Sequence, residues 1–161
     1  MKNAPVQARG FTLIELIVTL ALLAILLAMV APLTGGWTDR SRVQSAKSSL
    51  KTAISQARTA AIRNTENRLS SQTAASACID TSALTITAYR ITGTNDPCSS
   101  SNTKLKEASF ASGVSFKQGG TSVTCFVFNA NGVLMNSGSC ATTLDTITIK
   151  KNVEEEEIDA I

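Results

Sequence analysis

The sequence predicts an α+β protein in which a long apolar helix at the N-terminus continues into an amphipathic helix that packs on an antiparallel β-sheet. Three observations lead to this prediction. Residues 16–33 are 18 consecutive positions without a charged side chain. Apolar residues then recur at helical spacing, and a Ser/Thr-rich region with short alternating runs follows. The predicted segments are 1–10 (leader), 11–33 (apolar helix), 34–69 (amphipathic helix), 70–153 (β-rich domain) and 154–161 (acidic tail).

The composition excludes several classes of function. Of the 161 residues, 43% are hydrophobic and 17% are charged, so a disordered chain is not expected. The chain contains no histidine, which excludes Ser-His-Asp and Cys-His catalysis and every metal site with a histidine ligand. The sequence also lacks a glycine-rich phosphate loop and a pair of acids outside the tail. We therefore expect a protein that is not an enzyme and that uses no cofactor and no metal.

Residues 11–33 have the length and composition of a membrane-spanning helix. Eighteen helical residues extend about 27 Å, which is close to the thickness of the hydrocarbon core of a bilayer. The bases Lys2 and Arg9 precede this segment, and such flanks stay in the cytoplasm, so the residues after Leu33 are expected outside it. A cleaved secretory signal explains the segment less well, because the apolar run is too long and Met29 stands where a small residue is required.

One carboxylate, Glu15, interrupts the apolar segment. A charge at the centre of a bilayer costs about 2.5–3.5 kcal/mol, which makes Glu15 a candidate functional residue that needs a positive partner. Cleavage after Gly10 would supply this partner, because Phe11 would then carry a free α-amino group. That amine lies four residues before Glu15 within one chain, and between chains it can neutralise the Glu15 of a neighbour.

The octapeptide RGFTLIEL at residues 9–16 resembles the prepilin peptidase site of type IV pilins and type II secretion pseudopilins. This resemblance implies cleavage after Gly10, N-methylation of Phe11 and a role for Glu15 in aligning subunits during assembly. Pro32 stands where pilin helices commonly carry a kinking proline. The resemblance also implies insertion into the bacterial inner membrane, a periplasmic C-terminal domain and incorporation into a pilus or pseudopilus. The implied partners are prepilin peptidase, an inner-membrane assembly platform and other major and minor pilins.

Residues 34–69 are expected to form the amphipathic helix. Its apolar stripe consists of Val43, Ala46, Leu50, Ile54 (or Ala53), Ala57 and Ala61. Seven bases occupy other positions, namely Arg40, Arg42, Lys47, Lys51, Arg58, Arg63 and Arg68. A basic helix can bind DNA, but aromatic residues for base stacking are missing here. We therefore interpret the bases as a solvated face that is partly used for packing against neighbouring subunits.

The region after residue 70 is expected to form an antiparallel sheet. Alternation and turn residues predict strands at 84–89 and 146–149, a hairpin of 114–116 and 123–128 around Gly119-Gly120, and a tight turn at Asn131-Gly132.

Four cysteines lie in this region, at Cys78, Cys98, Cys125 and Cys140. No pair has CxxC spacing, so a zinc site is not expected. The periplasm is oxidising, which favours disulfides. Of the three possible connectivities we favour Cys78–Cys98 with Cys125–Cys140, because each bond closes a local loop.

The charges are unevenly distributed between the middle of the chain and its end. Residues 34–153 carry thirteen bases and six acids, a net charge of +7, whereas residues 154–161 contain five acids and no base. The four glutamates at 154–157 predict a solvated, frayed end. The alternative is a tail that docks on a basic face of a neighbouring subunit.

A second resemblance concerns the type of pilin. Residues 50–64 resemble the GspH/FimT/FimU group of minor pilins and pseudopilins, and FNANGV at 128–133 resembles the strand-Gly-strand region of that group. This resemblance implies a structural minor pilin that primes pilus assembly or links a tip complex to the shaft. A type II secretion pseudopilin and a DNA-binding minor pilin for natural transformation are the alternatives. The DNA-uptake members use a basic C-terminal motif, so the acidic end of this chain makes nucleic acid an unexpected partner.

Overall fold

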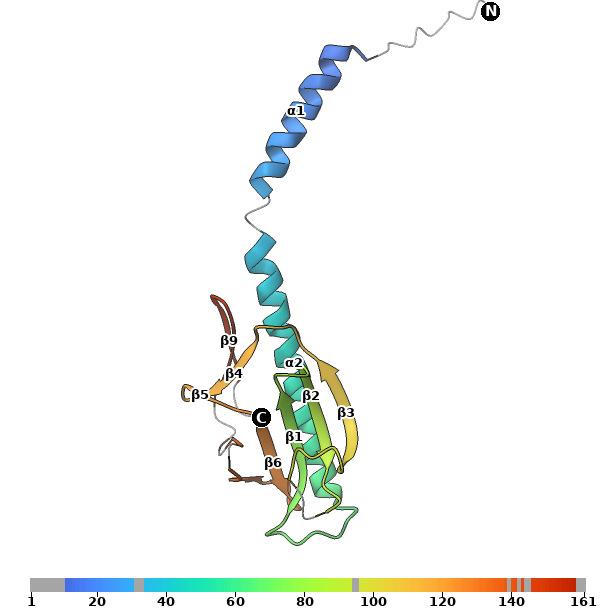
Figure 1. Cartoon of the computed structure of the whole chain (residues 1–161), viewed down its shortest axis with the longest axis vertical. Helices are drawn as coiled ribbons and strands as arrows, with labels where there is room; N and C mark the ends of the chain where they lie inside the picture. Colours follow the sequence, from blue (N-terminus) through green and yellow to red (C-terminus); the bar gives the residue numbers. More distant parts are fainter. Residues whose placement is uncertain are drawn as a thin grey trace, which may run out of the picture. The chain divides into compact units, whose positions relative to one another are not determined.

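The computed structural model describes residues 11–30, 34–93, 96–138, 140–141, 143 and 146–158 (Figure 1). The chain has two compact units, Met1–Trp37 and Thr38–Ile161. Its elements, in order, are the helices α1 (Leu13–Val30) and α2 (Thr34–Arg63) and the strands β1 (Thr73–Asp80), β2 (Thr85–Arg90), β3 (Thr103–Ser109), β4 (Ser115–Gln118), β5 (Thr121–Ser122), β6 (Cys125–Asn129), β7 (Leu134–Met135), β8 (Ile147–Lys151) and β9 (Glu154–Ile158). The predicted α+β class is therefore confirmed.

α1 is the apolar helix that the uncharged run predicts, and it has 18 residues. Within the described part of the chain, no helix is both long and apolar enough to cross a membrane. The predicted leader at 1–10, its cleavage residue Gly10 and the kinking residue Pro32 lie outside the described residues.

α2 is amphipathic, and its predicted apolar stripe is confirmed. Six of the stripe positions from Val43 to Ala61 are at most 1% exposed, and the alternative position Ala53 is 5% exposed. The predicted end of the helix at residue 69 is wrong, because α2 ends at Arg63. Asn64 adopts a positive φ of 40°, a conformation that asparagine tolerates after the last turn of a helix. Its side chain then binds the amide and carbonyl groups of Arg68, at 2.7 and 2.8 Å, which fixes the turn that leads away from the helix.

The strands form two antiparallel sheets rather than the single sheet expected. The larger sheet has the order β3-β2-β1-β6-β7, and the smaller one has the order β5-β4-β8-β9. The predicted strand 123–128 is split between them. The amide of Val123 still donates to the carbonyl of Phe116 of β4, whereas Cys125 pairs with Cys78 in the larger sheet. The chain therefore passes from the smaller to the larger sheet within residues 123–128, which the sequence predicted to be a single strand.

Both predicted glycine turns are present. Gly119 and Gly120, with φ of 55° and 85°, connect β4 to β5, and Gly132, with φ of 72°, lies between β6 and β7. Gly132 also packs closely on α2, since a Cβ atom there would lie 2.7 Å from Cγ1 of Ile62. Gly132 is thus required for its backbone conformation and for the close approach of this turn to the helix.

The core is formed by α2 and the inner faces of both sheets. Leu50 and Ile54 of α2 are buried together with Phe126 and Phe128 of the larger sheet and Ile149 of the smaller sheet. Phe110 and Phe116 stack edge to face, with ring centroids 5.2 Å apart. One helix therefore holds two separate sheets in a single folded unit.

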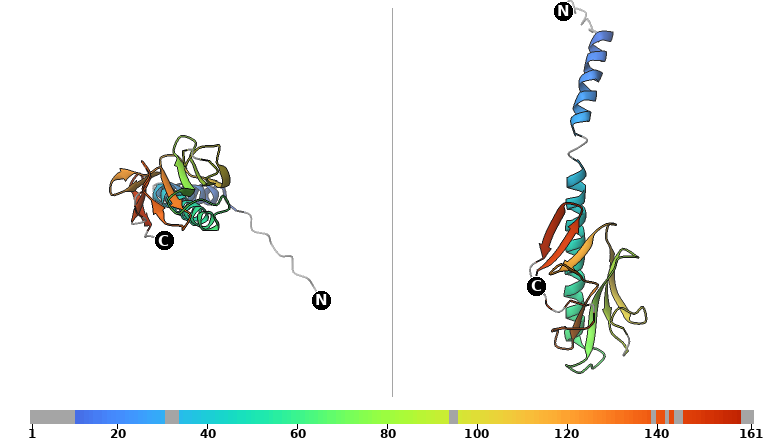
Figure 2. Two further views of the ribbon diagram at one scale, coloured as in Figure 1. Left: turned by 90° about the horizontal axis from the view of Figure 1, so that it is seen from below. Right: turned by 60° about the vertical axis from the view of Figure 1, so that its left-hand side comes forward.

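The acidic tail forms a strand, so the predicted frayed end is wrong for residues 154–158. These residues are β9, which pairs with β8 along its whole length and lies alongside α2 (Figure 2). Ile158 is buried in the core, and Glu156 binds Lys47 at 3.1 Å and Gln44 at 3.0 Å. The hydrogen bond from Lys47 is the main cause that lowers the pKa of Glu156 from its ordinary value. One buried isoleucine and a basic helix face thus outweigh the mutual repulsion of the glutamates.

Candidate assembly site at the N-terminus

α1 begins with a reciprocal cap formed by Thr12 and Glu15. The amide of Glu15 donates to Oγ1 of Thr12 at 3.3 Å, and Oε2 of Glu15 accepts from the amide and the hydroxyl of Thr12, each at 3.4 Å. This pattern is a capping box, in which two of the free amides at the start of a helix find acceptors. Sequence analysis missed this role of Glu15, although the T-x-x-E spacing at 12–15 indicates it.

The capping box leaves Glu15 accessible. Phe11, Glu15, Leu16 and Thr19 line a mostly apolar pocket of about 230 Å³ at the start of α1. The Phe11 side chain is 88% exposed, and the Glu15 carboxylate is also exposed. The structure therefore brings two of the predicted site residues, Phe11 and Glu15, to the same end of one helix. This arrangement presents an anionic group beside an apolar surface, and it can accept a cation from another molecule.

The surface of α1 is apolar on every side. Its described large hydrophobic side chains are 49–77% exposed, and they comprise Leu13, Ile14, Leu16, Ile17, Val18, Leu20, Leu22, Leu23, Ile25, Leu26 and Leu27. Exposed apolar surface of this extent is typical of a segment that contacts lipid or other protein chains. Relative to exposure to water, burial of each such side chain is worth about 1.5–3 kcal/mol, so an apolar cover over α1 is strongly favoured over water.

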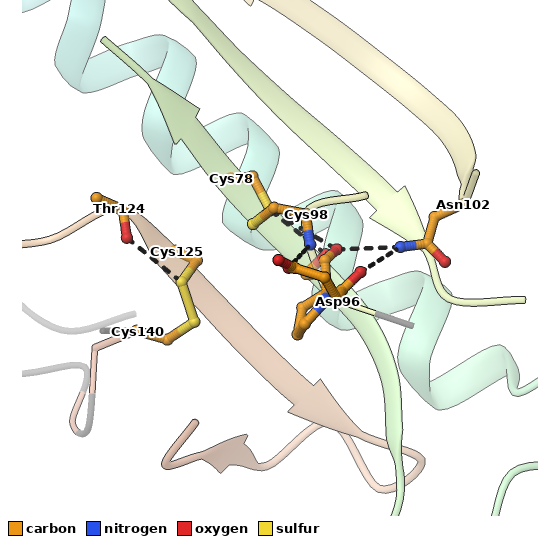
Figure 3. The surroundings of a disulfide bond; sticks show 9 residues. Cys78, Asp96, Cys98, Asn102, Thr124, Cys125 and Cys140 are labelled. Carbon is orange, nitrogen blue, oxygen red and sulfur yellow. Dashed lines mark hydrogen bonds between the residues drawn. A yellow bond between two sulfur atoms is a disulfide. The ribbon is translucent and has the colours of Figure 1, made fainter. Parts of the chain in front are cut away.

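The four predicted cysteines form two disulfides in the larger sheet and its loops. Cys78 of β1 is bonded to Cys98, and Cys125 of β6 is bonded to Cys140, which are the two local pairings favoured from the sequence (Figure 3). Hydrogen bonds support the first disulfide, because the amide of Cys98 donates to Asp96 Oδ1 at 2.8 Å and Asn102 donates to the Asp96 carbonyl at 3.0 Å. The two bonds therefore tie Cys98, which follows β2, and Cys140, which follows β7, to strands of the larger sheet.

The bases of α2 are used partly within the chain. Lys47 pairs with Glu156, and Arg42 lies 3.5 Å from Asp39. Arg68, which the sequence placed on the helix, follows it and donates to the carbonyl of Ile91 at 3.3 Å. The predicted basic face is therefore smaller than the count of bases suggests. Among the described residues, no group of three or more Cys, Asp or Glu side chains is placed to hold a metal ion.

Comparison with known families supports the interpretation of the N-terminal segment. The family described as the prokaryotic N-terminal methylation motif matches residues 7–31, which include Phe11, Glu15 and α1. Comparison with curated proteins and with solved structures finds no match. The match does not extend to the folded unit after Thr38, so it does not distinguish one group of these proteins from another. The chain thus carries the N-terminal segment of type IV pilin-like proteins, which supports its placement in the pilin and pseudopilin family.

Proposed function

We propose that this protein is a minor type IV pilin, a structural and non-enzymatic subunit that primes pilus assembly or links a tip complex to the shaft. Prepilin peptidase cleaves it between Gly10 and Phe11, and Phe11 is then N-methylated. Before assembly, the subunit is held in the inner membrane with the folded unit in the periplasm. It then passes through the assembly platform, and α1 joins a bundle formed with other major and minor pilins.

The observation that carries this proposal is a methylation motif on a helix whose apolar side chains are exposed all around. Such a helix requires an apolar environment, which the bilayer supplies before assembly and neighbouring α1 helices supply afterwards. In the bundle, packing between apolar α1 helices replaces their contacts with lipid, whereas Glu15 sets the register between subunits. A buried ion pair is weak as a source of stability, but an unpaired charge in an apolar bundle is strongly unfavourable.

Within one chain, the capping box already satisfies part of the hydrogen-bonding capacity of Glu15. It does not neutralise the charge, because Thr12 contributes only neutral donors. The amino group of Phe11 in a neighbouring subunit is the cation that fits, since Phe11 and Glu15 occupy the same end of α1. A subunit can therefore enter the bundle at the position where its carboxylate meets this amine.

A type II secretion pseudopilin is the second candidate, because it has the same N-terminal segment. Two disulfides and a Ser/Thr-rich surface favour a subunit that is exposed on a pilus. A DNA-binding pilin is less favoured, because the C-terminal strand β9 is acidic and part of the basic residues of α2 is engaged within the chain.

The role of Glu15 can be tested separately from its role in the capping box. Glu15→Gln keeps the capping pattern, in which glutamine also serves, but removes the charge. Thr12→Ala removes the cap and keeps the charge. We expect Glu15→Gln and Glu15→Ala to be processed and inserted normally but to enter filaments at a level at least tenfold below that of the original chain. Thr12→Ala should enter filaments at a nearly normal level.

The measurement is the ratio of filament-bound to membrane-bound subunit in sheared cells, determined by quantitative immunoblotting. If Glu15→Gln enters filaments normally, the charge does not direct assembly. If Thr12→Ala fails as severely as Glu15→Gln, the capping box rather than the charge is what assembly requires.

A further inference from the structure

The two disulfides lie next to each other on neighbouring strands of the larger sheet (Figure 3). Cys78 of β1 and Cys125 of β6 are register partners, so their side chains lie on the same face of the sheet. The adjacent residues Ala77 and Phe126 point to the opposite face and belong to the core, whereas the cysteines form a separate buried cluster. One sulfur atom of each disulfide therefore faces one of the other disulfide across two paired strands.

The hydrogen bonds of β1 and β6 define the spacing between Cys78 and Cys125. The amide of Ile79 donates to the carbonyl of Thr124 at 2.7 Å. The carbonyl of Cys125 points away from β1 and accepts from the amide of Ala141 at 2.8 Å. Cys78 and Cys125 are thus a non-hydrogen-bonded pair, in which the Cα atoms are about 4.5 Å apart. Since disulfides join Cα atoms about 4.4–6.8 Å apart, the backbone as it stands permits a bond between these two residues.

The cysteine cluster borders a cleft that a small thiol can enter. Cys78, Cys98 and Cys125 all line this cleft, which has a volume of about 510 Å³. Cys98 is half-buried, whereas the other three cysteines are 6–8% exposed. Cys98 is therefore the sulfur that a reductant reaches first, and the later steps take place inside the cluster.

We propose that the four cysteines form a redox-responsive device. Reduction by one equivalent of a dithiol moves the remaining disulfide to Cys78–Cys125 and releases both Cys98 and Cys140 from the larger sheet. The inference goes beyond the assembly role, because it concerns the folded unit after Thr38 and does not depend on α1.

The exchange consists of two reduction steps and one internal transfer. A thiolate of the dithiol attacks the sulfur of Cys98, and Cys78 leaves as a thiolate. The second thiol of the reagent attacks the mixed disulfide, so the reagent loses two electrons as a cyclic disulfide and Cys98 is released as a thiol. The Cys78 thiolate then attacks the sulfur of Cys125. The Cys125–Cys140 bond breaks, and the Cys140 thiolate takes a proton from water.

The same product forms when the reagent reduces Cys125–Cys140 first. In that case the Cys125 thiolate attacks the sulfur of Cys78, and Cys98 is the leaving thiolate. Both routes converge because Cys78 and Cys125 are the two cysteines that the strands hold opposite each other.

The folded chain favours the exchanged bond, because β1 and β6 are already paired when it forms. A Cys78–Cys125 bond therefore orders no further part of the chain. The original bonds instead hold Cys98 and Cys140, which lie outside the strands, between β2 and β3 and between β7 and β8. Release of these two residues returns conformational entropy to their segments.

The test is a partial reduction of the full chain in detergent with one molar equivalent of dithiothreitol. Acid stops the exchange, because a thiol with a pKa of about 8.5 is then protonated. A maleimide labels the trapped thiols at mildly acidic pH, and a non-reducing peptide map locates the label and the remaining bond. In the singly reduced chain we expect label on Cys98 and Cys140, and Cys78–Cys125 at least about threefold more abundant than either original bond.

Two double variants test the same geometry without a reductant. Cys98→Ser with Cys140→Ser leaves the two register partners, which should form a disulfide in air. Cys78→Ser with Cys125→Ser leaves two cysteines that lie outside the strands, and these should stay free thiols. Thiol titration measures both variants, and circular dichroism verifies that each is folded.

Three outcomes would overturn the proposal. The singly reduced chain could keep one of its original bonds as the main bond, or the folded Cys98→Ser/Cys140→Ser variant could keep two free thiols. The third outcome is a disulfide that forms as completely in the Cys78→Ser/Cys125→Ser variant. Because these measurements require no filament, their failure would leave the proposed assembly role untouched, and a failure of assembly would leave the disulfide result standing.

Discussion

The two helices of this chain differ in where their apolar side chains go. In α2 the apolar residues form one stripe, which is buried against two sheets of the same chain. In α1 the apolar residues occupy all sides, and the described ones are exposed. The stability of the folded unit should therefore depend on the residues of α2, whereas the residues of α1 should matter only where lipid or another subunit covers them. The predictions below test this contrast or a contact that α2 makes within the folded unit.

The largest expected effect comes from a matched pair of leucines. Leu50 of α2 is fully buried, and Leu23 of α1 is 53% exposed. Leu50→Ala should lower the free energy of unfolding of the folded unit by about 2–5 kcal/mol, because it leaves a cavity in the core. Leu23→Ala should leave that free energy unchanged. Urea unfolding of the full chain in detergent, followed by near-ultraviolet circular dichroism, measures both. Equal losses for the two variants would contradict the contrast.

The next effect concerns the disulfides, which belong to the folded unit alone. Replacement of Cys78 and Cys98 together by serine should cost about 2–4 kcal/mol of unfolding free energy, and the Cys125 and Cys140 pair should cost a similar amount. Both double variants should still carry a methylated Phe11, because the proposed processing acts on the N-terminal segment. Under reducing conditions, which break both disulfides, the original chain and each double variant should have the same free energy of unfolding. Failure of processing in either double variant would show that the two regions are not independent.

The smallest effect is a pH dependence that arises from β9. Lys47 lowers the pKa of Glu156 below its ordinary value of 4.5, so the carboxylate stabilises the folded unit at neutral pH. This contribution is fully present above 4.5 and is lost as the pH falls through the lowered pKa of the folded state. Glu156→Gln should therefore reduce stability at pH 7 and flatten the loss of stability as the pH falls below 4.5, while Glu157→Gln, which lacks this contact, should not. A steep acid limb that persists in Glu156→Gln would assign the effect to other carboxylates.

The same contrast explains which parts of the fold the sequence could predict. The stripe from Val43 to Ala61 was predictable because a helix repeats its own spacing, and the Asn131-Gly132 turn was predictable because its backbone conformation restricts the residue type. β1 was missed. It is buried along most of its length, so small residues such as Ala75 and Ala77 replace the usual alternation.

Strands at the edges of the sheets were missed for the opposite reason. β3 is an exposed edge strand with the sequence TKLKEAS, and β9 is an edge strand of four glutamates before Ile158. Neither strand contains enough apolar residues to show an alternating pattern. Both are held in place by pairing with a neighbouring strand, and β9 also by the ion pair between Lys47 and Glu156. Such strands are determined by tertiary contacts, which a single sequence does not display.

The candidate site divides in the same way. Phe11 and Glu15 could be identified from the octapeptide, because the methylation motif that matches residues 7–31 is a local sequence pattern. The contact between Lys47 and Glu156 could not be identified, because the two residues are 109 positions apart and meet only when β9 lies alongside α2.

Mass spectrometry of the N-terminal peptide tests the central proposal most directly. Surface filaments would be sheared from cells that express the chain, and both the filaments and the remaining envelope would be analysed for the peptide that starts at Phe11. We predict a methylated Phe11 in the filaments, at a small fraction of the amount of the main subunit. A processed peptide confined to the envelope would favour the secretion pseudopilin instead. An uncleaved peptide that contains residues 1–10 in both fractions would contradict the assignment of the N-terminal segment.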